Sequence, residues 1–166
     1  MSINSDKSKV YEFFDMMNIP YSIIDHPPLF SEADSLKHRV EIDGMIFKNL
    51  FLRNKSKSRY YLLSLPLNKK ADLLTLAKTL GESRLSFGSE TDLWDKLRIK
   101  PGAVSPLNII EAGSTDVILL IDDSYASFEK IGVHPNDNTA TILFDPMDLP
   151  RILDYYSVET RFVQLS

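Results

Sequence analysis

The sequence has 166 residues, of which 43% are hydrophobic and 25% are charged, and its formal net charge at pH 7 is −4. These proportions are ordinary for a globular protein, and the length suits a single domain over residues 1–166. The absence of cysteine excludes thiol nucleophiles, thiolate metal ligands and disulfide switches. A negative chain is also a poor match for a protein that grips a long nucleic-acid duplex, because that task usually needs a strongly basic face.

The first ten residues, MSINSDKSKV, lack the apolar core that a signal peptide carries. No stretch of the sequence approaches the roughly 20 consecutive apolar residues of a membrane span. We therefore expect a cytoplasmic protein that makes no contact with a membrane.

The chain begins with the pattern of an amphipathic helix. Apolar side chains recur at the spacing that places them on one helical face: Val10, Phe13, Phe14 and Met17. Residues 21–25 then indicate a short strand, which ends before two prolines. After it, Phe30, Ser31 and Asp34 resemble a hydrophobic staple with a capping box. They predict a short helix that reaches about Arg39.

Two apolar runs predict a β-hairpin in the next part of the chain. Residues 45–53 and 60–65 both suit strands, and the polar residues 54–58 between them suit a turn. A helix should follow, with Asn68 as its N-cap and Gly81 as its C-terminal stop. Its apolar positions are Leu73, Leu76, Ala77 and Leu80.

Helices and strands continue to alternate toward the C-terminus. Ser89 and Asp92 offer a capping box for another helix, and residues 101–106 suit a loop because glycine and proline interrupt regular structure. The remaining expected elements are strands over 117–121 and 139–144, a helix from Asp145 through Ile152, and an edge strand over 161–165. The pattern predicts one mixed α/β domain and leaves its strand order open.

Common catalytic and cofactor motifs are absent from the sequence. It has no P-loop, no GxSxG nucleophile elbow, no HExxH zinc motif and no GxGxxG dinucleotide motif. Its histidines, His26, His38 and His134, lack the spacing of metal ligands. We therefore expect neither a metal nor another cofactor.

Three polar features stand out against their surroundings. Lys48 lies within an apolar strand, so its side chain either reaches the rim of the sheet or meets an anionic partner. Gly102 and Pro106 bound a loop whose backbone amides could bind a phosphate, a carboxylate or an ester carbonyl. The polar turn from His134 to Thr139 precedes an apolar strand. Each feature alone is more often structural than functional.

Basic residues gather only locally. Arg53, Lys55, Lys57 and Arg59 occupy one predicted turn, and a smaller group precedes the loop at residue 101. Such groups are usually solvated turn charges. An RNA substrate would therefore contact a limited surface, such as its acceptor end.

Three segments together carry a family resemblance: Phe47-Lys48-Asn49-Leu50, Gly102-Ala103-Val104-Ser105-Pro106, and Gly132-Val133-His134-Pro135 with Asn138-Thr139. In order and spacing they resemble the bacterial YbaK and prolyl-tRNA synthetase-associated editing family, and most of all its freestanding alanyl-tRNA-Pro deacylases. The similarity extends over nearly the whole chain. It implies a single-domain fold with a mixed, barrel-like sheet surrounded by helices.

The resemblance implies an activity and a set of site residues. The activity is hydrolysis of the ester in mischarged alanyl-tRNA-Pro, with Lys48 near the terminal adenosine, Asn49 beside the ester and Gly102 in the substrate loop. These three residues are the expected catalytic ones. The residues expected to bind the substrate are Ser105, Pro106 and His134. The expected partner is the acceptor end of mischarged tRNA, not DNA, and prolyl-tRNA synthetase is a second partner to test.

The expected mechanism needs no covalent intermediate, since no nucleophile and base pair is evident. An aminoacyl ester is already reactive, so positioning a water and stabilising the oxyanion can suffice. Two alternatives stay open from the sequence. One is editing of another mischarged tRNA, such as cysteinyl- or seryl-tRNA. The other is a non-catalytic RNA- or nucleotide-binding module with the same fold.

Overall fold

The structure, a computed structural model, describes residues 5–28 and 43–165. Its helices are α1 (Ser5–Met16), α3 (Leu73–Leu80), α4 (Glu90–Leu97), α5 (Asn108–Ala112) and α6 (Asp148–Tyr155), with a 3-10 helix, η1 (Asp123–Ser127). Its strands are β1 (Tyr21–Asp25), β2 (Met45–Asn54), β3 (Tyr60–Pro66), β4 (Leu85–Phe87), β5 (Ile118–Asp122), β6 (Ile131–Val133), β7 (Ala140–Phe144) and β8 (Thr160–Val163). None of the helices in these two ranges has the length and apolar character needed to cross a bilayer.

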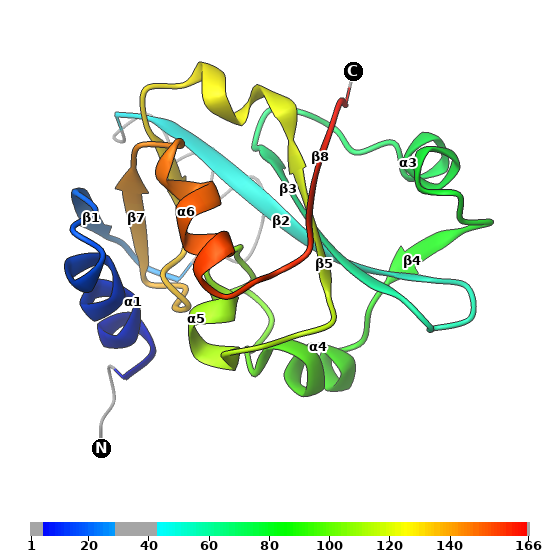
Figure 1. Cartoon of the computed structure of the whole chain (residues 1–166), viewed down its shortest axis with the longest axis horizontal. Helices are drawn as coiled ribbons and strands as arrows, with labels where there is room; N and C mark the ends of the chain where they lie inside the picture. Colours follow the sequence, from blue (N-terminus) through cyan, green and yellow to red (C-terminus); the bar gives the residue numbers. More distant parts are fainter. Residues whose placement is uncertain (1–4, 29–42, 166) are drawn as a thin grey trace.

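The strands form one eight-stranded mixed sheet in the order β1-β7-β6-β2-β3-β5-β8, with β4 also paired to β2. The long strand β2 joins the two parts of the sheet. Its first two residues pair in parallel with β6, and from Phe47 onward it pairs antiparallel with β3. Figure 1 shows β2 running across the molecule, with β1 and β7 toward one end and β4 toward the other. The mixed α/β fold expected from the sequence is confirmed.

Alternate side chains of β2 face two different hydrophobic cores. Phe47 and Phe51 belong to the larger core, which also receives apolar side chains from α1, α4, α5 and α6. Leu50 and Leu52 pack against the smaller core, to which α3 contributes. The ladder between β2 and β3 has an unbroken register, so the strand is regular and contains no bulge. Both faces of this part of the sheet are therefore covered.

Most of the elements expected from local patterns are confirmed. The strand β1 has the predicted bounds, and β2 and β3 form the predicted antiparallel hairpin. Gly81 ends α3 in the left-handed conformation, with φ of 75°. The Ser89 side chain accepts a hydrogen bond from the backbone N–H of Asp92 and so caps α4. The short helix predicted from Phe30 to Arg39 lies outside the described residues.

Two predicted helix starts were wrong. The N-cap of α3 is Asp72 and not Asn68, because the Asp72 carboxylate accepts hydrogen bonds from the N–H groups of Leu74 and Thr75. The last helix, α6, begins at Asp148 and continues past Ile152 to Tyr155. Asp145 instead starts a turn, in which the Asp148 N–H donates to the Asp145 carbonyl. The sequence also gave no sign of β4, α5, β6 or η1.

Candidate functional site

The residues predicted to form the site lie around β6 and the loops packed beside it. The parallel ladder between β2 and β6 ends with the pair Ile46–Gly132. Lys48 and His134 each lie two residues further along the chain from that pair. Because the two strands are parallel, they carry Lys48 and His134 in the same direction from adjacent positions.

Gly132 allows β6 to pack tightly against its neighbours on this face of the sheet. A Cβ atom at Gly132 would lie 2.9 Å from Ile46 Cδ1 and 3.0 Å from Thr141 Cγ2, which is too close for carbon atoms. Ile46 and Thr141 therefore project on the side where a Gly132 side chain would stand. A larger residue at 132 would require the Ile46, Thr141 and Leu143 side chains to move.

His134 directly follows β6 and is partly buried. Its Nδ1 lies 3.0 Å from the Ala140 carbonyl oxygen, which can only accept, so Nδ1 carries a hydrogen. Burial, with a smaller effect of His26, lowers the pKa of His134 below its usual value of 6.5. The Ala140 hydrogen bond and the Asp137 carboxylate oppose only part of that shift. The ring is therefore neutral at pH 7, and its Nε2 is an acceptor.

A second histidine, His26, stands beside His134, with the ring centroids 5.9 Å apart. Its Nε2 lies 2.8 Å from the Thr141 hydroxyl, and its Nδ1 lies 2.9 Å from the Pro27 carbonyl oxygen. From the sequence, His26 was a candidate only for a metal ligand, and its spacing did not support that role. The pairing of β1 with β7, which brings His26 to this place, has no local signal in the sequence.

The loop before α5 contains three of the predicted residues. Gly102 is exposed and has a φ of 91°, a conformation that residues with a side chain rarely adopt. A Cβ atom at Gly102 would lie 3.2 Å from Asn138 Nδ2, so the loop and the turn after His134 approach each other here. Ser105 is fully buried, and its hydroxyl accepts a hydrogen bond from the Leu107 N–H. Pro106 is also buried.

Two buried asparagines join this loop to the turn. Asn108 Nδ2 donates to Asn136 Oδ1 at 2.7 Å and to the Ala103 carbonyl at 3.1 Å, and Asn108 Oδ1 accepts from the Ser105 N–H at 2.9 Å. Asn136, held at a φ of 63°, donates to the Leu107 carbonyl. Neither asparagine was predicted as a site residue. Together they fix the position of Gly102 relative to His134.

The far end of the same turn is held by charge. Asp137 accepts hydrogen bonds from the hydroxyl and the N–H of Thr139, and the Lys7 ammonium donates to that hydroxyl at 3.1 Å. Burial opposes ionisation of Asp137, but the Thr139 hydrogen bonds and the nearby Lys7 and His134 together lower its pKa below the usual 3.8. The turn is therefore anchored to α1 through Lys7.

Lys48 and Asn49 leave β2 on opposite faces. Lys48 is partly exposed and shares the side of Leu50 and Leu52. Asn49 points to the side of Phe47 and Phe51. Its Oδ1 is buried and has no hydrogen-bond donor within the described part of the chain. A buried acceptor without a donor destabilises the fold, so a ligand that donates a hydrogen bond to Asn49 Oδ1 would be stabilised there.

The structure therefore brings Gly102, Ser105, Pro106 and His134 together through the asparagine pair. It places Lys48 on the strand next to β6, and it turns the Asn49 side chain to the other face of β2. Residues 5–28 and 43–165 contain no group of three or more His, Asp or Glu side chains that could hold a metal ion.

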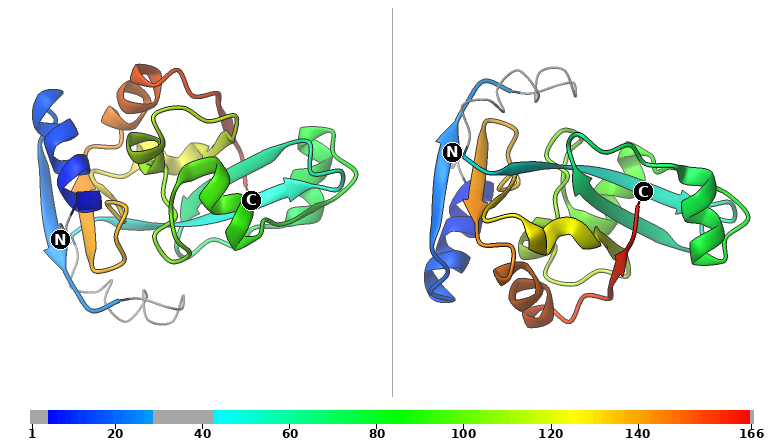
Figure 2. Two further views of the ribbon diagram at one scale, coloured as in Figure 1. Left: turned by 90° about the horizontal axis from the view of Figure 1, so that it is seen from below. Right: turned by 90° about the horizontal axis from the view of Figure 1, so that it is seen from above.

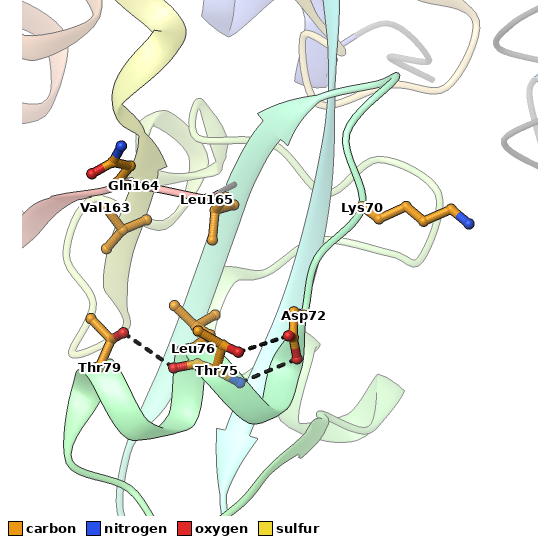
Figure 3. Close-up of a pocket in the computed structure, with 8 residues that line it drawn as sticks. All are labelled: Lys70, Asp72, Thr75, Leu76, Thr79, Val163, Gln164 and Leu165. Carbon is orange, nitrogen blue, oxygen red and sulfur yellow. Dashed lines mark hydrogen bonds between the residues drawn. The ribbon is translucent and has the colours of Figure 1, made fainter.

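A pocket of about 150 Å³ lies elsewhere, between α3 and β8. Figure 3 shows its lining residues: Lys70, Asp72, Thr75, Leu76, Thr79, Val163, Gln164 and Leu165. The Asp72 carboxylate in its wall is already engaged with Thr75 and the start of α3. None of the predicted site residues lines this pocket.

Comparison with known proteins bears on this site. The model of the aminoacyl-tRNA editing domain family matches residues 26–152, which include the predicted site residues. The chain is 34% identical over 147 residues to the prolyl-tRNA editing protein ProX of Acetoanaerobium sticklandii, covering 89% of this chain and 90% of that protein. It is 31% identical over 150 residues to the prolyl-tRNA synthetase associated domain-containing protein 1 of Danio rerio, covering 89% and 81%.

A solved structure shares the fold. It is described as a trans-editing enzyme candidate for prolyl tRNA synthetase, and it superposes with a TM-score of 0.71 over 99% of this chain and all of that chain. The sequence identity between the two is 12%, so this likeness concerns the fold alone.

Proposed function

The chain belongs to the aminoacyl-tRNA editing domain family, and we propose that it acts in trans as a deacylase that hydrolyses the ester of mischarged alanyl-tRNA-Pro. The names of its relatives support tRNA-Pro as the substrate. The observation that carries the proposal is the arrangement of two loops. The exposed Gly102 backbone and the neutral ring of His134 are fixed relative to each other, beside the strand that carries Lys48.

Each of these groups suits one part of an aminoacyl ester of RNA. The Lys48 ammonium would bind the anionic end of the tRNA, where the terminal nucleotide carries the amino acid. The backbone at Gly102 is open to a close approach by the ester carbonyl, because glycine has no side chain of its own and the residue is exposed. His134 Nε2 would accept a hydrogen bond from the substrate's amino group or from a water.

The remaining predicted residues have supporting roles in this proposal. Asn49 offers a buried acceptor that lacks a donor among the described residues, which suits contact with a bound polar group. Ser105 and Pro106 are buried, so they would act on the substrate by shaping the loop from beneath. Asn108 and Asn136 would hold that loop in place.

The chemistry needs a positioned water and stabilisation of the charge that develops on the carbonyl oxygen. The N–H groups of Gly102 and Val104 would provide that stabilisation, since those of Ala103 and Ser105 already donate to the Lys100 carbonyl and to Asn108. The free ribose hydroxyl beside the ester is available on the substrate itself to orient the water. No step in this scheme requires a side-chain nucleophile or a metal.

The choice of alanine follows from the limits of size discrimination. A synthetase pocket shaped for proline rejects a smaller amino acid weakly, because a missing methylene is worth only about 1–3 kcal/mol. A second site that is too small for proline can then remove alanine. Editing of cysteinyl- or seryl-tRNA is the alternative specificity. A cytoplasmic location and an association with prolyl-tRNA synthetase are parts of the same proposal.

Deacylation assays with several charged tRNAs test the proposal. The purified protein should release alanine from alanyl-tRNA-Pro well above the spontaneous rate and should leave prolyl-tRNA-Pro intact. Cysteinyl- and seryl-tRNA in parallel reactions decide between the specificities. Equal or faster cleavage of the prolyl ester would refute the small-pocket argument. Tight binding without hydrolysis of any ester would favour a non-catalytic RNA-binding module.

A further inference from the structure

We propose that the tip of the β2–β3 hairpin is a second tRNA contact, which binds backbone phosphates of the duplex that adjoins the acceptor end. We call this surface the basic tip and define it as Arg53, Lys55, Lys57 and Arg59. The inference rests on the proposed function, because it assumes that the end of the tRNA lies at Lys48. It goes further in assigning a surface to the body of the RNA.

The basic tip has a rigid frame, which is built around one buried side chain. Asn54 is 4% exposed, and its Oδ1 accepts hydrogen bonds from the N–H groups of Ser58 and Arg59 at 2.9 and 3.0 Å. Its Nδ2 donates to the Ser58 hydroxyl and to Glu82. Lys57 is held at a φ of 59° in this turn. A cationic turn with a fixed backbone loses less conformational entropy on binding than a flexible one.

The charge of the basic tip is largely available to a ligand. Lys55, Lys57 and Arg59 are exposed. The nearest carboxylate, Glu82, faces inward with a side chain only 9% exposed, where it lies 3.5 Å from Arg59 Nε and accepts from Asn54 and Tyr61. Asp92 accepts a hydrogen bond from the Tyr60 hydroxyl, which with a smaller effect of Lys57 lowers its pKa, so this carboxylate stays ionised and offsets part of the charge at Lys57. The sequence 53–59 itself contains no acidic residue.

The position of the basic tip fits a tRNA acceptor arm. The same strand, β2, contains Lys48 and ends at Asn54, so the two ends of this segment lie about 20 Å apart at roughly 3.3 Å per residue. Both views in Figure 2 place the β2–β3 turn at the end of the molecule opposite β1 and α1. An acceptor arm has a single-stranded end followed by a duplex. With its end at Lys48, the duplex can extend over the surface outside the covered sheet, in the direction in which β2 runs, and reach the basic tip.

The chemistry of the contact would be independent of sequence. Lysine and arginine bind phosphate oxygens and position a nucleic acid without reading its bases. Each neutralised phosphate releases counterions, which makes the affinity fall with salt. A contact confined to one hairpin also suits a chain whose overall charge is −4, since that charge is unfavourable for a wider RNA surface.

The test compares a variant that lacks two charges of the basic tip with a control variant that lacks two charges elsewhere. The tip variant is Lys55→Gln with Lys57→Asn, where asparagine is chosen because it tolerates a positive φ. The control is Lys70→Gln with Lys78→Gln, two exposed lysines at α3. Binding of uncharged tRNA-Pro is measured by fluorescence anisotropy from about 50 to 300 mM salt. Hydrolysis is measured with alanyl-tRNA-Pro and with a short alanylated single strand ending in CCA, which cannot reach the basic tip.

In the tip variant, the slope of log affinity against log salt should become shallower by about two, one for each lost phosphate contact. Its KM for alanyl-tRNA-Pro should rise severalfold, while its rate on the short substrate and its melting temperature stay at the wild-type values. The control should keep the wild-type slope. An unchanged slope in the tip variant, or an equal change in the control, overturns the proposal.

Loss of activity with the short substrate would also overturn it, because the damage would then lie at the site. Failure of the wild type to hydrolyse any ester would refute the proposed function and leave the binding comparison readable.

Discussion

Replacing Asn108 by alanine tests whether the buried asparagine pair positions the loop that carries Gly102. The substitution removes hydrogen bonds to the Ser105 N–H, the Ala103 carbonyl and Asn136 Oδ1. All of these groups lie in a region that is buried, with Asn108 itself 1% exposed. Three groups are then left without this partner, the Ser105 N–H, the Ala103 carbonyl and Asn136 Oδ1, at about 1–3 kcal/mol each. A loss of stability of at least about 3 kcal/mol, the lower end of their sum, is expected.

For a protein of this size, a loss of about 3 kcal/mol lowers the melting temperature by roughly 6–12 °C. The variant should therefore fold at low temperature, where its activity can be measured. With the loop released from the turn, we expect kcat on the short alanylated substrate to fall by at least about tenfold, which corresponds to about 1.4 kcal/mol of lost positioning. KM should change less, because Lys48 is untouched.

Asn54→Ala is the matched control for this experiment. Asn54 is also a buried asparagine with several hydrogen bonds, but it lies in the β2–β3 turn. It should lose comparable stability and keep wild-type kcat on the short substrate. If both variants lose activity in proportion to their melting temperatures, Asn108 is merely structural. A wild-type kcat in Asn108→Ala would refute the positioning argument directly.

Four further outcomes are expected. Lys48→Ala should abolish deacylation with little change in melting temperature, and Lys48→Arg should rescue poorly because a planar fork replaces a compact ammonium; a large fall in melting temperature would point to a structural lysine. Gly102→Ala should cost about 1–2 kcal/mol of stability from the positive φ and should also reduce kcat, since its Cβ would press on Asn138. The pKa of His134 is lower in the folded state than its unfolded value of about 6.5, so folding is favoured while the ring is neutral. This stabilisation is complete above about pH 6.5 and is lost as the pH falls from there toward the folded pKa. The melting temperature of His134→Gln should therefore fall less than that of the wild type over that pH range. Exhaustive chelation should leave activity intact once the tRNA is folded with magnesium, and recovery that depends on zinc would overturn this expectation.

The parts of the fold that the sequence predicted are those with a complete local signal. The bounds of β1 and the β2–β3 hairpin follow from apolar runs that are interrupted by polar turns. Helix α4 was found through its Ser89 cap, whereas α5 has no side-chain cap and only five residues. Strand β6 has only three residues, and a side chain at its Gly132 would collide with Ile46 and Thr141. Such requirements come from tertiary packing and leave no periodicity to detect.

The candidate site divides in the same way. Gly102 and His134 could be found because a family resemblance pointed to their segments. Asn108 and Asn136 could not, because an asparagine beside a loop is usually a surface residue, and only the fold shows that these two are buried together. The opposite directions of Lys48 and Asn49 were predictable from strand alternation. The face of β2 that meets the loops could not be predicted, because it depends on the pairing of β2 with β6. That pairing joins Ile46 to Gly132, which are far apart in the sequence.

The charge distribution also explains how a negative chain can serve an RNA substrate. Affinity for the body of a tRNA would rise with every added phosphate contact, and the uncharged product would keep those contacts after hydrolysis. Binding energy that both forms share lowers KM without raising kcat. Confining the RNA contacts to Lys48 and one hairpin would keep that shared energy small. The discrimination then depends on the aminoacyl group, which only the substrate carries and which the Gly102 loop and His134 would contact.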